Sequence, residues 1–287
     1  PKEDVLDWQR WWLYNRDRFL QVRRVLSRRR TTTDSEAPEA DWRGEAVRAL
    51  LEALDDDHVD VATGSALALG KTGDPRAVEP LIEVLKDRKA RQTVREAAAL
   101  GLGMLTADEG RTALVDLLLD RREPERLRAF AAFGLGIHRS PSALPALVTV
   151  VRDRQAPRSA RAAALVALGH LGDDIVLPVL LDAVKGKIAG ITDLERACAL
   201  DGLGRLGDPA AIPILLKGLA VKDRWLRQAS VLALGRIEET EGNRARDALR
   251  HLSLHEENRM VRTLATIALG RTGRPEAAVP LLQLGDS

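Results

Sequence analysis

The chain has 287 residues, a formal net charge of +2 and one cysteine, Cys198. The small net charge argues against a strong overall attraction to nucleic acid or to anionic membranes, and a single cysteine excludes an internal disulfide and a cysteine metal cluster. Apolar residues make up 45% of the chain and aromatic residues only 3%, so the core must be aliphatic. No apolar run reaches the roughly 18 residues of a membrane span.

Residues 1–30 are predicted to form one long helix that is rich in aromatic side chains. Five of the nine Trp, Tyr and Phe residues lie between Trp8 and Phe19. A tryptophan face and a leucine stripe at seven-residue spacing together cover more of the circumference than one packing contact requires. The simpler interpretation is that the tryptophan face caps the open end of the fold. The alternative, which the wide apolar circumference leaves open, is that the helix also contacts a partner. The candidate partner-binding residues are Leu6, Trp11, Leu13, Tyr14 and Leu20.

The composition of residues 31–42 is that of a linker or an exposed loop. Helical spacing resumes at residue 43, where Leu50 and Leu54 lie 31 residues before Leu81 and Leu85. The N-terminal helix therefore stands where the first helix of an initial repeat is expected. We predict three regions, which are a Trp- and Arg-rich helix at 1–30, a linker at 31–42 and repeats at 43–287.

The repeats are marked by a recurring Leu-Gly pair, whose glycine is the anchor of each unit. Successive anchors are 33, 33, 33, 35, 31 and 35 residues apart, and a constant period of this length is typical of stacked helical repeats. The seven anchors are Gly70, Gly103, Gly136, Gly169, Gly204, Gly235 and Gly270.

Each unit is predicted to contain two helices joined by a short turn. The first helix ends near the anchor, and its small residues allow a neighbouring helix to approach closely. In "KTGDP", Gly73 suits a left-handed helix end, Asp74 the next N-cap and Pro75 the first helical position, and "RLGDP" repeats these roles at 207–209. The second helices carry a leucine eleven residues after the anchor: Leu81, Leu114, Leu147, Leu180, Leu215 and Leu281.

Three places depart from this pattern. The connection at 185–193 is irregular, and the segment after Gly235 is about three residues longer before Leu249, so a longer turn is expected there. The seventh unit reaches the end of the sequence without a polar capping segment. We expect either that the stack continues or that a partner covers this end.

These units resemble the HEAT-repeat family, and most closely the short bacterial HEAT-like repeats that are also found in phycobilisome lyases. The resemblance covers about residues 43–287. It implies an all-α fold, a right-handed α-solenoid of about seven and a half stacked two-helix repeats, here with a long N-terminal capping helix. Some bacterial HEAT-repeat proteins have a similar Trp-rich N-terminal segment, and that likeness favours a secreted or periplasmic protein over a cytoplasmic one.

An arginine recurs eight residues before six consecutive anchors, whereas the first unit has Ala62 there. The arginines are Arg95, Arg128, Arg161, Arg196, Arg227 and Arg262, and aspartates precede the first three by eight residues, at Asp87, Asp120 and Asp153. We interpret this set as a structural ladder like that of HEAT repeats, in which each arginine pairs with the preceding aspartate. The alternative is a row of cations that binds phosphates. Gly186 and Val221 replace the aspartate later, which would leave Arg196 and Arg227 freer.

The sequence offers little to support catalysis. His251 and His255 are one helical turn apart, but no third metal ligand is apparent, and we expect no metal there. One relative, deoxyhypusine hydroxylase, builds an iron site from several His-Glu pairs, whereas here only His255 and Glu256 form one. Cys198 lies in a packed helix, and no nucleophile motif or phosphate-binding loop appears. We therefore predict no catalytic residues, no metal and no cofactor.

The most consistent interpretation is a non-enzymatic scaffold that binds protein, an α-solenoid subunit of a larger assembly. Its partner would be another protein or further copies of the chain, and nucleic acid is not the expected ligand. Two alternatives stay open, namely a nucleic-acid-binding solenoid that uses the ladder from Arg95 to Arg262, and an enzyme that resembles the chromophore lyases.

Overall fold

The computed structural model describes residues 42–237 and 243–271 and divides the chain into two compact units, Pro1–Glu45 and Ala46–Ser287. The described residues form helices and contain no strand, which confirms the all-α solenoid. None of the described helices combines the length and apolar character that a bilayer crossing requires. The predicted N-terminal helix and almost all of the linker lie outside the described residues.

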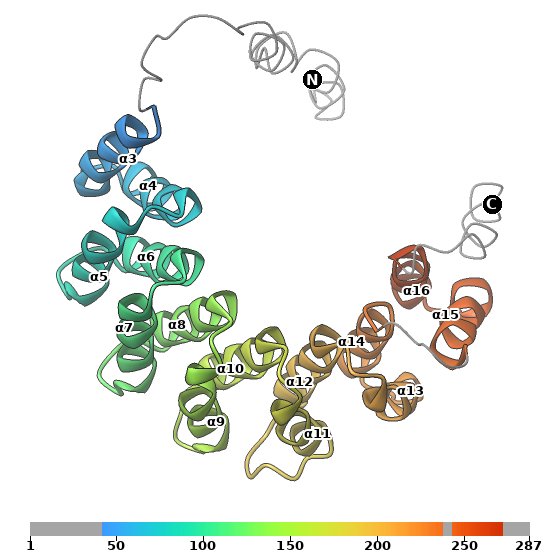
Figure 1. The fold of residues 1–287 in the computed structure, drawn as a ribbon. Coiled ribbons are helices and arrows are strands. Elements are labelled where there is room, and N and C mark those ends of the chain that lie inside the picture. The colour runs from blue at the N-terminus through green and yellow to red at the C-terminus, as the bar shows by residue number, and fades with distance from the viewer. Residues whose placement is uncertain (1–41, 238–242, 272–287) are drawn as a thin grey trace, which may run out of the picture. The chain divides into compact units, whose positions relative to one another are not determined.

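The helices of the second unit form two layers, as Figure 1 shows. The first helices of successive repeats pack side by side in one layer: α4 (Val59–Thr72), α6 (Gln92–Leu105), α8 (Glu125–His138), α10 (Arg158–Leu171), α12 (Asp193–Leu206), α14 (Arg224–Leu234) and α16 (Arg259–Arg271). The second helices form the other layer: α3 (Trp42–Glu52, which crosses the unit boundary), α5 (Val78–Lys86), α7 (Asp108–Leu119), α9 (Leu144–Arg152), α11 (Leu177–Val184), α13 (Ile212–Leu219) and α15 (Arg244–His255).

Contact between neighbouring first helices is made at the anchor glycines. A Cβ atom added to Gly70 would lie 2.5 Å from the Cα of Gly101, which stands two residues before the next anchor. The same relation holds at every further described step, where the partner is always Gly or Ala: Gly103 with Gly134, Gly136 with Ala167, Gly169 with Gly202, Gly204 with Ala233 and Gly235 with Ala268. Any larger side chain at an anchor would push two helix backbones apart.

The core between the layers is aliphatic, as the composition requires. The leucine placed eleven residues after each anchor is completely buried in all five units where the structure describes it: Leu81, Leu114, Leu147, Leu180 and Leu215. Leu281 lies outside the described residues. These side chains join one continuous cluster that runs from Val47 to Leu269, so each repeat completes the core of its neighbours.

The turns within the repeats follow the predicted chemistry with one difference. Gly73 has a left-handed conformation (φ 68°), and the Asp74 carboxylate accepts hydrogen bonds from the side chain and the backbone N–H of Arg76, at 2.8 and 2.9 Å. These two bonds, the side-chain one first, lower the pKa of Asp74 to about 2. Pro75, however, opens a short 3-10 helix, Pro75–Ala77, which leads into α5. The equivalent turn at Pro209–Ala211 is built in the same way.

The irregular connection predicted at 185–193 is present between α11 and α12. It contains two glycines in the left-handed region, Gly186 and Gly190, and ends in a capping box in which Thr192 and Glu195 bond to each other's backbone N–H. The longer turn expected after Gly235 falls partly outside the described residues.

A Gly169→Ala substitution should lower the free energy of unfolding by about 1–3 kcal/mol, because the new methyl group would collide with the backbone of Gly202. Gly64→Ala is the matched control, since it lies in α4 with nothing within 4 Å of the added Cβ. That change should instead stabilise the protein by about 0.5–1 kcal/mol. Chemical denaturation measures both, and equal effects at the two positions would contradict the close-contact model.

Candidate protein-binding surface

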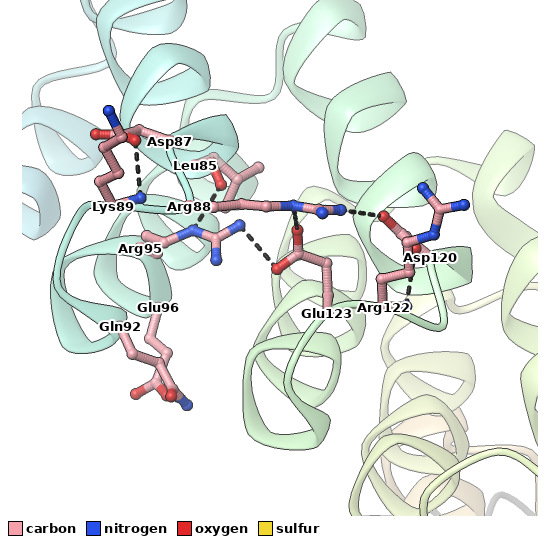
Figure 2. Close-up of polar contacts among 10 residues, drawn as sticks. All are labelled: Leu85, Asp87, Arg88, Lys89, Gln92, Arg95, Glu96, Asp120, Arg122 and Glu123. Atoms are coloured by element: carbon pink, nitrogen blue, oxygen red, sulfur yellow. Dashed lines mark hydrogen bonds and ion pairs between the residues drawn. The ribbon is translucent and has the colours of Figure 1, made fainter.

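The first three ladder arginines, Arg95, Arg128 and Arg161, are buried, and the first two of them bind backbone carbonyls at the ends of second helices. Figure 2 shows Arg95, whose Nε donates to the carbonyl oxygen of Leu85 at 2.9 Å and whose Nη2 lies 2.9 Å from the Glu123 carboxylate. In the next unit, Arg128 Nε donates to the carbonyl oxygen of Leu118, also at 2.9 Å. Each arginine thus satisfies the end of the preceding second helix, whose last carbonyls have no partner within the helix.

The predicted pairing of each ladder arginine with the aspartate eight residues before it is wrong. Asp120 pairs at 2.9 Å with Arg88 (Figure 2). Asp153 pairs at 2.9 Å with Arg121, so each aspartate bonds an arginine of the preceding loop. Asp87 accepts a hydrogen bond from the backbone N–H of Lys89 at 2.8 Å. The aspartates therefore shape the loops that follow the second helices, while the buried arginines face the helix ends.

The later ladder arginines are also engaged. Arg161 Nε lies 3.1 Å from Glu195 Oε1 in a buried ion pair that is not aligned as a hydrogen bond. Arg196 donates to the carbonyl oxygen of Val184 at 3.0 Å. Arg227 pairs with the Glu256 carboxylate, and Arg262 Nη1 donates to the Glu256 carbonyl oxygen at 2.7 Å. These contacts engage every ladder arginine with the protein's own carbonyls or carboxylates, and they disfavour a continuous row of free cations for phosphates.

The other residues selected from the sequence divide into two groups. The candidates in the N-terminal helix, Leu6 to Leu20, lie outside the described residues. The rings of His251 and His255 are 5.0 Å apart between centroids, and the described part of the chain has no group of three or more His, Cys, Asp or Glu side chains that could hold a metal ion. Burial raises the pKa of the Cys198 thiol to about 11, so the thiol stays protonated and is a poor nucleophile.

An apolar row on the first helices was not predicted from the sequence. It stands three residues before each anchor, and all of its members are at least partly exposed. The row reads Leu67, Leu100, Phe133, Val166, Asp201, Leu232 and Ile267. Since these residues share one register on neighbouring helices, they form a stripe across the layer, which Asp201 alone interrupts.

The stripe is widest at α6, α8 and α10. On α6 and α8 the position just after the anchor is also apolar, so Met104 and Ile137 widen it. We call Leu100, Met104, Phe133, Ile137 and Val166 the α6–α10 patch. Phe133 is 39% exposed.

Phe133 is held in place by its neighbours on α8. Its ring packs edge-on against Phe130, with the ring centroids 6.5 Å apart, and the Arg126 guanidinium lies 5.7 Å from the centroid of the Phe130 ring. The phenyl ring is thus fixed while one side stays open, which suits an interface anchor.

A cluster of paired charged side chains around Asp201 borders the α6–α10 patch on its C-terminal side. Arg205 Nε lies 2.6 Å from the Asp201 carboxylate, which also pairs with Arg236, and Arg205 Nη1 lies 2.8 Å from His170 Nε2. Burial would raise the pKa of Asp201, but the hydrogen bonds from the two arginines outweigh it and lower the pKa. Burial and the nearby positive charge of Arg205 lower the pKa of His170, so its ring accepts a hydrogen bond as neutral imidazole.

Known proteins resemble this chain in family and in structure. The model for HEAT repeats matches residues 47–129, 111–191 and 192–270. No curated protein sequence matches. A solved complex of CpcE and CpcF of phycocyanin lyase from Nostoc sp. PCC7120 is similar over 89% of this chain and 97% of that chain, at 20% identity with a TM-score of 0.54. Human deoxyhypusine hydroxylase is similar over 80% of this chain and 86% of that chain, at 24% identity with a TM-score of 0.36.

Replacing Arg161 with Met should cost about 3–5 kcal/mol of unfolding free energy, because it leaves the completely buried carboxylate of Glu195 without its cation. Arg196→Met should cost less, about 1–2 kcal/mol, since its carboxylate partner Asp193 is 60% exposed and can be hydrated, and the main loss is the hydrogen bond to the Val184 carbonyl. Urea denaturation of both variants tests this order, and a larger loss for Arg196→Met would contradict it.

The lowered pKa of His170 predicts a pH-dependent stability. The unfolded state takes up a proton on this ring near pH 6.5, whereas the folded state takes it up only at a lower pH. Stability should therefore fall as the pH drops below about 6.5. The charges around the ring are those of Arg205, Arg139, Asp201 and Arg236.

Denaturation of the wild type and of His170→Gln at about pH 8 and about pH 5.5 measures this effect. Glutamine keeps an acceptor for Arg205 and does not titrate. The variant should lose less stability than the wild type between the two pH values, and an equal loss would remove His170 as the cause.

Proposed function

This chain belongs to the HEAT-repeat family, and we propose that it is a non-enzymatic scaffold that binds a partner protein on the exposed face of its first helices. The partner contributes apolar side chains to the α6–α10 patch and acidic side chains to the cationic positions beyond it. The chain acts in this proposal as one subunit of a larger assembly.

The apolar stripe at a single register, which is partly exposed throughout and most exposed at Phe133 and Ile267, is the observation that carries this proposal. Each repeat could place a polar residue three positions before its anchor without disturbing the core, as Asp201 demonstrates, yet the other six units place an apolar residue there. Contiguous exposed apolar surface is unusual on a protein that has no partner, and it typically marks an interface. Phe133, with its ring fixed by Phe130, is the expected centre of this interface.

The charge beside the patch indicates the chemistry of the partner. In the position just after the anchor, the later units carry Arg205, Arg236 and Arg271, whereas the middle units carry Met104 and Ile137. A bound segment that runs along the layer would therefore meet an apolar surface first and next a cluster in which Arg205 and Arg236 share the single carboxylate of Asp201, with Arg271 beyond it. Complementary charge favours a partner segment with acidic residues after its apolar ones.

The two alternatives have less support. The ladder arginines bond carbonyls and carboxylates of the protein itself, which leaves the nucleic-acid alternative without its row of cations. The likeness to the phycocyanin lyase complex, at 20% identity, is evidence of the fold alone. The raised pKa of Cys198 supports the absence of a thiol nucleophile.

Phe133→Asp should weaken partner binding by about 2 kcal/mol, roughly 30-fold in Kd, because it places a charge at the centre of an apolar contact. The partner is identified first, by quantitative mass spectrometry of the proteins that the wild-type chain retains from native cells. Calorimetry with the purified partner then gives the Kd of the wild type and of the variant. The melting temperature should fall only modestly, since Phe133 is 39% exposed and the change removes one aromatic contact, with Phe130.

Leu194→Asp provides the matched control. Leu194 is also an exposed apolar residue, at 59%, but it lies in the first turn of α12, outside the stripe. It should bind the partner like the wild type. A partner that binds both variants equally well would show that the α6–α10 patch is not the interface.

The N-terminal stripe of Leu6, Leu13 and Leu20 is proposed as a second contact with the partner protein. Leu13→Glu should reduce association and leave the melting temperature nearly unchanged, whereas Trp12→Ala should destabilise the chain. Equal destabilisation by the two changes would mean that the segment is only a cap.

We also propose that the protein is exported from the cytoplasm. Cell fractionation tests this location.

A further inference from the structure

A cavity lies in the layer of second helices, in the groove between α11 and α13. Its volume is about 420 Å³, which falls within the usual range for small-molecule sites. The floor is apolar and is formed by side chains of four successive helices: Leu181, Leu200, Ile214 and Leu226, with Val221 at one end. This groove is separate from the exposed face of the first helices, so a ligand bound here would be independent of the proposed protein partner.

Three cations line the cavity, and none of its described lining residues is acidic. They are Lys185 at the end of α11, Arg196 on α12 and Lys217 on α13. Arg196 uses Nε for the carbonyl of Val184 and Nη1 for Asp193, while its Nη2 has no partner in the part of the chain that the structure describes. The two lysine side chains are exposed and form no ion pair within residues 42–237 and 243–271.

Two substitutions in the repeat make this cavity more positive than the equivalent surface of other units. Thirteen residues after the anchor, the four preceding units have Glu83, Asp116, Thr149 and Asp182, whereas this unit has Lys217. Seventeen residues after the anchor, the first three units have an aspartate, whereas Val221 stands here. A position that is acidic in three of the four preceding units has thus become a cation, and another has become part of an apolar wall. The fold does not require Lys217, because the helices of the preceding units form with an acidic residue or a threonine at that position. Val221 lies just beyond α13, which ends one residue earlier than α5 and α9 do.

We propose that this cavity binds a small amphiphilic anion, a carboxylate that carries an apolar chain. The apolar body would cover the leucine and isoleucine floor, which gains stability from the area removed from water. The carboxylate would lie among Lys185, Arg196 and Lys217, where charge-assisted hydrogen bonds hold it. A neutral or cationic molecule of the same shape would leave the three positive charges without a counterion.

Titration calorimetry of the full chain with decanoate tests the assignment, with decanol and decyltrimethylammonium as ligands of matched chain length. Decanoate should bind at one site, at least about tenfold more tightly than either control, and its affinity should fall with rising salt. Equal affinity for decanol would overturn the assignment of an anion. A decaglutamate peptide that binds more tightly than decanoate would overturn the assignment of a small molecule in favour of an acidic protein segment.

Variants that restore the sequence of the other repeats locate the site. Lys217→Glu reproduces the residue type of Glu83, and Val221→Asp reproduces that of Asp87. Each should weaken decanoate binding by about tenfold or more. Lys217→Glu should leave the melting temperature unchanged because Lys217 is exposed, whereas Val221→Asp should lower it slightly because Val221 packs against the core.

Lys222→Glu is the control for net charge. It makes the same charge change as Lys217→Glu one residue beyond Val221, but Lys222 does not line the cavity. Its affinity for decanoate should stay within about twofold of the wild type. If Lys222→Glu weakens binding as much as Lys217→Glu, the anion is attracted by the overall charge and not by this cavity. Unchanged binding in Lys217→Glu and Val221→Asp would overturn the proposal outright.

Discussion

The close approach of successive first helices is the constraint on which the rest of this structure depends. At every described step, an anchor glycine lies against a Gly or Ala of the next unit, and a Cβ at the anchor would collide with that backbone. This contact sets the spacing and register of the layer. The register in turn aligns the buried leucines on one side of the first helices and the exposed apolar row on the other. The core and the candidate interface thus follow from one repeated contact.

The distribution of charge follows from the same register. Where the second helices end, buried arginines satisfy carbonyls, and loop arginines pair with the aspartates of the next unit. A solenoid with 44 basic and 42 acidic residues therefore neutralises much of its charge internally. Net positive character persists where the pattern is broken, as at Lys217 and Val221, and at the arginines that follow the later anchors. Such departures from the repeat are the places where binding specificity can be added without cost to the fold.

The sequence alone determined the repeat, its period, the two-helix unit and the turn chemistry at Gly73 and Asp74. These are local or periodic properties, since small residues, caps and apolar spacing have the same consequence in any unit. The same alignment also contained the signal for the exposed row, three residues before each anchor. The sequence could not distinguish this row from a buried one, because apolar periodicity marks a packed face and an exposed face alike.

The tertiary structure decided which charges meet. An eight-residue offset made Asp87, Asp120 and Asp153 the expected partners of the ladder, but the arginine side chains extend to Leu85 and Leu118 carbonyls and to Glu123 and Glu195. A constant spacing in the sequence does not determine which charged groups pair, because the long arginine side chains reach different partners once the helices are stacked. The cavity between α11 and α13 depends on the structure for the same reason: its lining comes from four helices, and only their packing brings Lys185, Arg196 and Lys217 around one apolar floor.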